Sequence, residues 1–538
     1  GYTFNIAFGT SVALNIKYEN NNPILNESFF GIGNSKFPFK GNIIISGAAD
    51  TSIYMEENNW GCLFNNLSNE ASIISASSNN FVLHSACKDI NDTEVNKRSF
   101  MLARKITITE NNKELNISGF RFGESEGTSI QGAYVIDDDN VGLVAGSVQP
   151  FNDATSFSID LTNSITNGKY IIKSKNGIAG GLIGYIEPNA NVEIVLPNNY
   201  NFEVNSNTNN AGLLIGTNNG SVSFSNDANH ILNGTVSSPL ASGLIGENND
   251  NASVLFNNNI SITLNSEGAY CGGLIGYNHG TIRTNDVTIN NSSLKATNAL
   301  GGFIGISSSN CENGGIVING NILLNNNTLN SEKALYVGGL IGSLITQEDM
   351  TLENINVCNT INYSTSSNNC IIGGLIGYLQ ANGNFKLKLN DKSKISIIAK
   401  SGTIGGIIAS IDSTKDKMVL IEGNGTTNDS LELNLNIKSN SNIYLGGIAG
   451  KIKGYTKINN LKLINTFSSQ NMPYYAKIAH IVLDDSILDI GNINLKETSS
   501  IGTTLVNKVG ESKTGVVRLN GTIDDASTNI YHIVREQN

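Results

Sequence analysis

A short glycine-rich motif recurs along the middle of this chain and constrains its fold more than any other feature. Its clearest form is Cys271-Gly272-Gly273-Leu274-Ile275-Gly276. Successive copies lie roughly 30 to 40 residues apart, a period typical of stacked supersecondary units. The other copies begin at Gly180, Gly212, Gly243, Gly301, Gly338 and Gly373, with weaker versions at Gly405 and Gly446. We also expect a degenerate copy at Gly61-Cys62-Leu63-Phe64-Asn65.

Between the motifs, apolar residues alternate with polar ones. Phe385, Leu387 and Leu389 alternate with Lys386 and Lys388. A period of two predicts β-strands with one buried face and one wet face. Clusters of Asn, Ser, Gly and Asp separate these runs, and such residues tolerate the backbone angles of turns. Each period therefore holds about three short strands and three corners, given a strand length of roughly five residues.

One such unit cannot bury its own apolar face, so the chain is expected to coil and to stack each turn on the last. The sequence thus predicts an all-β fold, a β-solenoid that is most simply a parallel β-helix with about three short strands per coil. The paired glycines fit this fold, because a position without a side chain lets the backbone turn sharply or approach a neighbour closely.

The motif, followed by a short turn as in Gly276-Tyr277-Asn278-His279-Gly280, resembles the GLUG repeat of bacterial surface proteins and IgA-peptidase-type exoproteins. The resemblance covers approximately residues 136–482. It implies secretion or cell-surface placement and a role in adhesion or as a stalk, with a peptidase domain attached in some members. The zinc-peptidase signature His-Glu-x-x-His is missing from this chain, so the enzymatic part is not carried over.

The composition excludes some classes of partner. The net charge is −11 and only 15% of the residues are charged. This argues against nucleic acid as a partner, because that binding depends on Lys and Arg neutralising phosphates. The chain contains no run of eighteen or more apolar residues, so the sequence predicts no transmembrane helix. The chain begins at Gly1 and not at Met, which is the pattern expected after removal of a secretory signal peptide. A sequence that starts at an arbitrary point of a longer chain would look the same.

We expect three regions in the chain: an N-terminal β region over 1–135, a repeat solenoid over 136–482 and a C-terminal β cap over 483–538. Residues 1–18 open with alternating apolar residues, and two interpretations stay open for them. The strand caps the first coils of its own solenoid, or it is donated to a neighbouring molecule through main-chain hydrogen bonds. The candidate inter-subunit residues are Tyr2, Phe4, Ile6 and Phe8.

The six cysteines permit disulfides in an exported protein. Their positions are Cys62, Cys87, Cys271, Cys311, Cys358 and Cys370. The pairs nearest in sequence, Cys62 with Cys87 and Cys358 with Cys370, are the candidate disulfides. The alternative is that the cysteines are buried thiols on solenoid ladders, and the sequence alone does not choose between the two.

We find no catalytic, cofactor-binding or metal-binding constellation in the sequence. A glycosidase needs two carboxylates on either side of a bond. The adjacent acidic pairs, such as Glu348-Asp349, point to opposite faces if they lie on strands. His279 occupies a turn position that is variable between repeats, and the other histidines lack the spacing of metal ligands. The sequence therefore predicts a protein that is not an enzyme.

Three functional hypotheses follow. The leading one is a secreted or cell-surface solenoid that acts as an adhesin or stalk, with a glycan or protein ligand. The alternative is a self-associating subunit of an extracellular filament or sheath, joined end to end by terminal β-strands. A polysaccharide-acting enzyme is a minor alternative, because many parallel β-helices have that activity.

Overall fold

The computed structural model of the chain shows two compact units, Gly1–Asn265 and Ser266–Asn538, which are described separately. The residues that it describes are all in strands, turns and irregular segments, with no helix among them. They are 3–7, 14–16, 37–46, 50–55, 62–75, 81–88, 95–99, 101–118, 120–122, 129–135, 140–165, 169–197, 199–225, 230–309, 315–364, 369–389, 393–423, 431–437, 443–469, 476–483, 485–499, 516–519 and 523–525.

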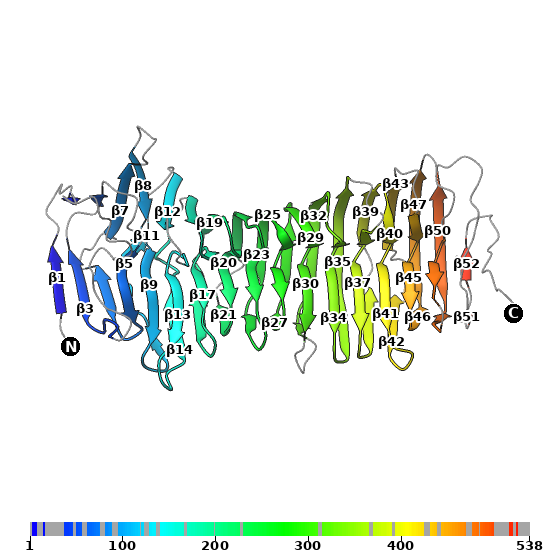
Figure 1. Cartoon of the computed structure of the whole chain (residues 1–538), viewed down its shortest axis with the longest axis horizontal. Helices are drawn as coiled ribbons and strands as arrows, with labels where there is room; N and C mark the ends of the chain where they lie inside the picture. The colour runs from blue at the N-terminus through cyan, green and yellow to red at the C-terminus, as the bar shows by residue number, and fades with distance from the viewer. Residues whose placement is uncertain are drawn as a thin grey trace. The chain divides into compact units, whose positions relative to one another are not determined.

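In the first unit, strands from successive coils stack in parallel columns (Figure 1). The motif column contains β5 (Cys62–Ser68), β9 (Met101–Ile108), β13 (Ala145–Pro150), β16 (Ala179–Gly180), β17 (Ile183–Ile186), β20 (Ala211–Asn218) and β23 (Ala241–Asn248). The column that follows it contains β10 (Lys113–Glu114), β14 (Ser156–Asp160), β18 (Asn191–Val195), β21 (Ser221–Ser225) and β24 (Ser253–Phe256). Further pairings join β12 (Ser129–Val135), β15 (Lys169–Ser174), β19 (Asn199–Ser206) and β22 (His230–Ser237).

The start of this unit continues the pattern with shorter strands. One sheet contains β1 (Thr3–Ala7), β3 (Asn42–Ser46) and β6 (Ser72–Ser75). A second set contains β2 (Leu14–Ile16), β4 (Asp50–Met55), β7 (Phe81–Lys88) and β11 (Phe120–Phe122). The pairing of β7 with β8 (Val95–Ser99) is antiparallel, in contrast to the parallel pairings above.

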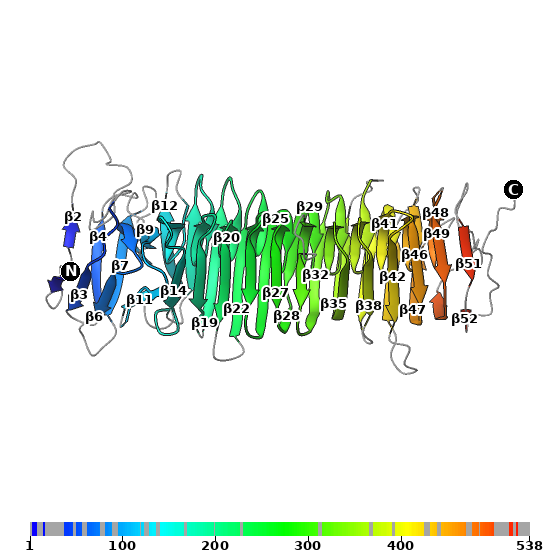
Figure 2. The same cartoon turned by 90° about the horizontal axis from the view of Figure 1, so that it is seen from below.

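The second unit repeats the arrangement, as the view from below also shows (Figure 2). Its motif strands are β26 (Ile275–Asn278), β30 (Ile304–Ser309), β34 (Ile341–Thr346), β37 (Ile376–Ala381), β41 (Ile408–Ser413), β45 (Ala449–Lys453) and β48 (Ala479–Val482). The strands before the bend are β29 (Ser293–Gly301), β33 (Tyr336–Gly338), β36 (Ile371–Gly373), β40 (Gly402–Gly405) and β44 (Ile443–Gly446).

Two more columns complete its coils. One contains β28 (Val287–Asn290), β32 (Ile322–Ser331), β35 (Met350–Tyr363), β39 (Lys394–Ala399), β43 (Leu431–Ile437), β47 (Leu461–Ser469), β50 (Ile493–Ser499) and β52 (Ile523–Asp525). The other contains β38 (Phe385–Leu389), β42 (Met418–Gly423), β46 (Tyr455–Asn459), β49 (Ile487–Ile490) and β51 (Val516–Leu519), and β27 (Thr281–Thr284) pairs separately with β31 (Ile316–Ile318). Strands that stack in parallel, coil on coil, confirm the predicted β-solenoid.

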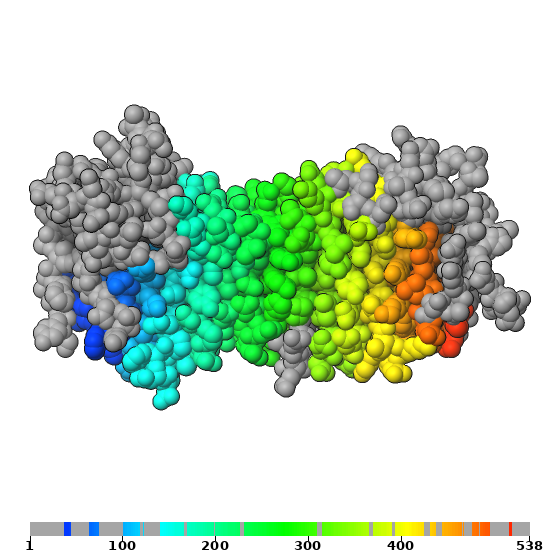
Figure 3. All heavy atoms as spheres, in the orientation of Figure 1, coloured from blue at the N-terminus to red at the C-terminus, as the bar shows by residue number. Residues whose placement is uncertain are grey.

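Alternating side chains fill the interior with ladders of like residues. Ile159, Ile194, Phe224 and Phe256 stand in register on four successive strands, and all are at most 2% exposed. The rings of Phe224 and Phe256 stack with their centroids 5.0 Å apart. In the space-filling view, the atoms of successive coils follow one another in colour order along each unit (Figure 3). Burial of this alternate set is the main stabilising term for each coil.

The structure explains the glycines of the repeat by close backbone approach. In the coil around Gly338, a Cβ on this first glycine would overlap the carbonyl oxygen of Ile341, three residues later. A Cβ on the second glycine, Gly339, would overlap the carbonyl of Gly374 in the next coil. A Cβ on the last, Gly342, would meet the carbonyl of Gly305 in the preceding coil. The motif therefore makes a tight bend and brings neighbouring coils together, as predicted.

Asparagine forms many of the corners. Eight of the described residues with positive φ other than glycine are Asn and one is Asp485. They include Asn251 at φ 62° and Asn326 at φ 53°. Asn adopts this left-handed conformation more readily than most residues, since its short side chain bonds locally. The prediction that Asn-rich clusters make the corners is confirmed.

The glycine-poor N-terminal region contains hidden copies of the motif. Phe64 pairs with Ala103, which pairs with Ala145, and Ala145 pairs with Ile183 of a clear copy. Phe64 thus takes the Ile position of the repeat, in agreement with a degenerate copy at Gly61-Cys62-Leu63-Phe64-Asn65. Ala103 marks a further copy that the sequence pattern did not reveal.

Candidate functional site

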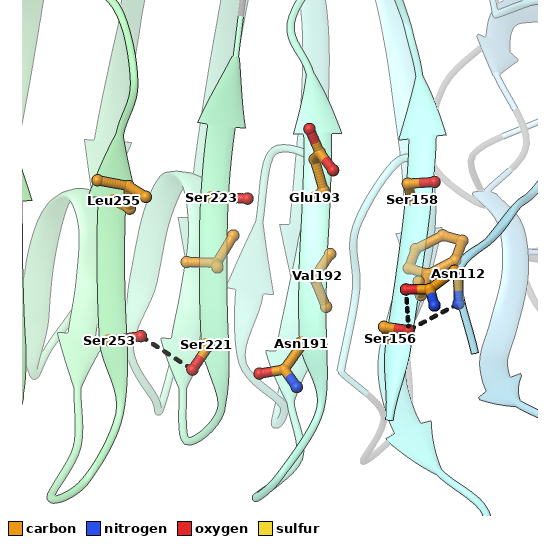
Figure 4. Close-up of a pocket in the computed structure, with 12 residues that line it drawn as sticks. Asn112, Ser156, Ser158, Asn191, Val192, Glu193, Ser221, Ser223, Ser253 and Leu255 are labelled. Atoms are coloured by element: carbon orange, nitrogen blue, oxygen red, sulfur yellow. Dashed lines mark hydrogen bonds between the residues drawn. The ribbon is translucent and has the colours of Figure 1, made fainter. Parts of the chain in front are cut away.

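The candidate site is a groove on the outer face of the first unit, with a volume of about 430 Å³. Side chains from four adjacent strands project toward it (Figure 4). We call it the serine groove, because five of its lining residues are serines. The lining residues are Asn112, Ser156, Phe157, Ser158, Asn191, Val192, Glu193, Ser221, Val222, Ser223, Ser253 and Leu255.

The parallel register sets the outward side chains of the groove, which are polar apart from Leu255, in two rows. Ser156, Asn191, Ser221 and Ser253 pair in one row across β14, β18, β21 and β24. The second row contains Ser158, Glu193, Ser223 and Leu255. Residues between the rows point inward, so the sheet is apolar inside and polar outside. Each row offers a side chain about every 4.8 Å.

The first row is held by hydrogen bonds. Ser253 Oγ donates to Ser221 Oγ at 2.9 Å. The Asn112 main-chain N–H donates to Ser156 Oγ at 2.7 Å, and Asn191 Nδ2 lies 3.4 Å from Thr155 Oγ1. Figure 4 draws the bonds at Ser253 and Ser156. These bonds fix the edge of the groove on which they lie.

The second row keeps its hydrogen-bonding capacity for a ligand. The side chains of Ser158, Glu193 and Ser223 make no hydrogen bond with any residue that the structure describes. Glu193 is the single charged residue of the lining. Two hydroxyls and a carboxylate on adjacent strands suit a ligand that carries several hydroxyl groups.

The sequence pattern did not identify this groove. Its signal is the alternation Ser156-Phe157-Ser158 and Ser221-Val222-Ser223, which predicts strands but does not say which strands are neighbours. The rows arise only once coils of different length align their strands in register.

The predicted inter-subunit residues are placed only in part. Phe4 and Ile6 lie on β1, which pairs in parallel with β3 of the same chain. Tyr2 and Phe8 lie outside the described residues. Because β1 ends the order β1-β3-β6, one of its edges faces no other described strand. The strand joins its own solenoid, and strand donation to a second molecule stays a prediction.

Cys358 and Cys370, the second candidate disulfide pair, are not bonded to each other in this structure, and each thiol has a different environment. Cys358 is half-buried on β35 and lies 3.6 Å from Asn356 Oδ1. Cys370 is 1% exposed and donates to the carbonyl of Ser401 at 3.0 Å, and burial raises the pKa of its thiol. One thiol faces outward and the other inward. The side chains of Cys62 and Cys87 lie outside the described part, and their disulfide stays a prediction.

Acidic residues and histidines form hydrogen bonds at the corners and edges of the coils. Asp349 accepts the main-chain N–H of Asn384 at 2.7 Å, and its hydrogen bonds lower the pKa of this carboxyl. His279 Nδ1 lies 2.8 Å from Ser308 Oγ. No group of three His, Cys, Asp or Glu in the described part of the chain is arranged to hold a metal ion. Nor does that part contain a helix that could span a membrane.

No family model, curated protein or solved structure matches the chain.

Proposed function

We propose that this protein is a secreted or cell-surface adhesin whose β-solenoid binds glycans through the serine groove. The observation that carries the proposal is the second row of the groove. There, the side chains of Ser158, Glu193 and Ser223 lie on adjacent strands and make no bond within the described structure. The GLUG-like repeat supports the surface placement.

The chemistry of the groove favours a carbohydrate that is not acidic. Sugar hydroxyls both donate and accept hydrogen bonds, and they match serine hydroxyls and a carboxylate acceptor. Glu193 repels anionic sugars, and the net charge of −11 acts in the same direction. A neutral or amino-sugar chain that lies across the coils would contact a new row member at each strand.

A glycan array with the full chain tests the proposal, followed by calorimetric titration of the glycans retained. Ser158→Val with Ser223→Val removes both free hydroxyls while keeping residues that favour strands. We expect the affinity for the glycan to fall about tenfold or more, because the variant loses two hydrogen bonds that contribute about 1 kcal/mol each. Ser396→Val is the matched control, because Ser396 is a half-buried, outward-facing serine on β39.

Two outcomes would overturn the proposal. One is an array on which the wild-type chain retains no glycan. The other is a double variant that binds as tightly as wild type while circular dichroism shows an unchanged fold.

A filament subunit is the second candidate, and the end position of β1 in the order β1-β3-β6 favours it. Edge strands offer unpaired main-chain groups to a neighbouring molecule. The minor alternative, an enzyme acting on polysaccharide, shares the glycan ligand, and the same arrays would supply its substrates.

A further inference from the structure

Aromatic side chains cluster on the outward face of the second unit, on both sides of the glycine bend. We call Tyr270, Tyr277, His279, Tyr336 and Tyr378 the aromatic strip. The rings of Tyr270 and Tyr277 stack with centroids 4.9 Å apart, and His279 lies 4.2 Å from Tyr277. The rings of Tyr336 and Tyr378 stack at 5.4 Å. All five side chains are half-buried.

The glycine bend brings these rings together. Tyr336 lies two residues before the first glycine of its motif, and Tyr378 directly follows the last glycine of the next coil. In register, Tyr336 pairs with Ile371, and Tyr378 pairs with Ser343 on one side and Ser410 on the other. The bend thus places the two outward positions on either side of the motif next to each other.

The Tyr378 ring lies between Tyr336 and the strand of the following coil. Tyr336 covers one face, and the register neighbour in the following coil is Ser410. Partial burial raises the pKa of the Tyr378 phenol, with a smaller contribution from the charge of Asp412. That acid forms an ion pair with Lys453 at 3.1 Å. The ring is fixed by its neighbours and still reaches the surface.

The strip is uncharged along its length. The outward residues of β26, β30, β33, β34, β36 and β37 that the structure describes include Ile306, Ser308, Ile345 and Ile371, and none is Asp, Glu, Lys or Arg. Charged residues around the strip include Lys295 on β29 and Asp412 in the coil after Tyr378. A neutral surface within a chain of net charge −11 complements an uncharged ligand.

Two aromatic clusters lie two coils apart. Tyr277 pairs with Ile306 and Ile306 with Ser343, which belongs to the coil of Tyr336. This separation is about 10 Å, twice the spacing of adjacent strands. An extended sugar chain that crosses the coils would meet both clusters.

We propose that the aromatic strip binds an uncharged polysaccharide by stacking sugar rings on its tyrosines. The face of an aromatic ring is electron-rich and attracts the weakly positive C–H groups on the flat side of a pyranose. Tyrosine offers this contact area with few rotatable bonds to immobilise. The inference rests on the proposed role in glycan binding, but it places the glycan on a second surface and names neutral, multi-ring glycans as the ligand class.

The test compares variants of the full chain in calorimetric titrations with cello-, chito- and laminari-oligosaccharides and with soluble mannan. We expect Tyr336→Ala with Tyr378→Ala to weaken binding tenfold or more, and Tyr378→Phe to retain it, because the ring remains. Tyr185→Ala is the matched control. Tyr185 follows the last glycine of its own motif in the first unit, and Asn219 donates to its hydroxyl. Saturation-transfer NMR should show contact at ring C–H protons in wild type.

The outcomes separate the strip from the serine groove. Loss of binding in the tyrosine double variant but not in Ser158→Val/Ser223→Val supports the strip and overturns the groove. The reverse result overturns the strip. Binding only to polyanions also overturns it. A change in sedimentation of the tyrosine double variant without any glycan binding would instead make the strip an interface between copies of this chain.

Discussion

The side-chain amide of Asn218 donates to the side-chain oxygen of Asn248 at 2.9 Å, one coil to the next inside the first unit. Neither residue is exposed to solvent. Asn218 also donates to the carbonyl of Ser253 at 3.1 Å and accepts the N–H of Gly220 at 3.2 Å. A single amide therefore joins two coils and closes a corner.

Replacing Asn218 by Leu should destabilise the first unit by about 2–4 kcal/mol, because several buried polar groups lose their partner at about 1–3 kcal/mol each. Asn176→Ala, at an exposed corner, should cost less than about 0.5 kcal/mol. Urea denaturation measures both changes. Equal midpoints for the two variants would show that the asparagine pair does not stabilise the coils.

The first and the last glycine of a motif should differ in their tolerance of alanine. At Gly373, a Cβ would overlap the carbonyl oxygen of Ile376 in the same bend, so Gly373→Ala should cost about 3 kcal/mol. Gly377→Ala should cost about 1 kcal/mol. Ile376 pairs with Ile408 of the next coil, so Gly377 corresponds to Ala409 there. The repeat therefore already accepts a Cβ at this position. Hydrogen exchange of the neighbouring strands measures the difference, and a larger effect at Gly377 would contradict it.

Thr456 should gain stability on replacement by Val. It is fully buried, and its hydroxyl makes no hydrogen bond with any described residue. Thr456→Val should stabilise the second unit by about 1 kcal/mol, since a buried hydroxyl without a partner is costly. The control is Thr217→Val, which should destabilise the first unit by about 1 kcal/mol, because Asn210 donates to the Thr217 hydroxyl at 3.0 Å. Stabilities come from urea denaturation, and a loss at Thr456 would contradict the account.

The second unit should lose stability in mild acid through His480. The ring is 8% exposed and its Nδ1 accepts the main-chain N–H of Leu445 at 3.2 Å. Burial lowers the pKa of His480 below its ordinary value of 6.5. The unfolded chain therefore binds the proton more readily, and stability falls as the pH drops below about 6.5 toward the lower folded pKa. His480→Asn should reduce this slope in unfolding curves taken between pH 7 and pH 5, and an unchanged slope would exclude the histidine as its cause.

Removal of residues 1–9 tests the two candidate functions against each other. Under the adhesin proposal, electron microscopy of the full and truncated chains should show isolated particles in both samples. Fibres that form from the full chain and vanish on truncation would replace the adhesin by a filament subunit joined through β1.

The 30-to-40-residue period and the two-residue alternation were sufficient to predict a parallel β-solenoid. They state directly how often the chain returns and which side chains point inward. The Asn-rich corners followed as well, because positive φ is a local property of the residue. Phe64 illustrates a degenerate copy that was still recognisable from its neighbours, Cys62 and Leu63.

Tertiary structure decided which outward residues became neighbours. Ser158, Glu193 and Ser223 are separated by 35 and 30 residues, and only the register of their strands brings them into one row. The stacking of Tyr336 on Tyr378 likewise depends on the bend at the glycines. The sequence left open whether Cys358 and Cys370 form a disulfide, and the winding of the coil places the Cys358 thiol on the outward face and buries the Cys370 thiol. Periodicity determines the coil, whereas contacts between coils depend on corner lengths that no local pattern specifies.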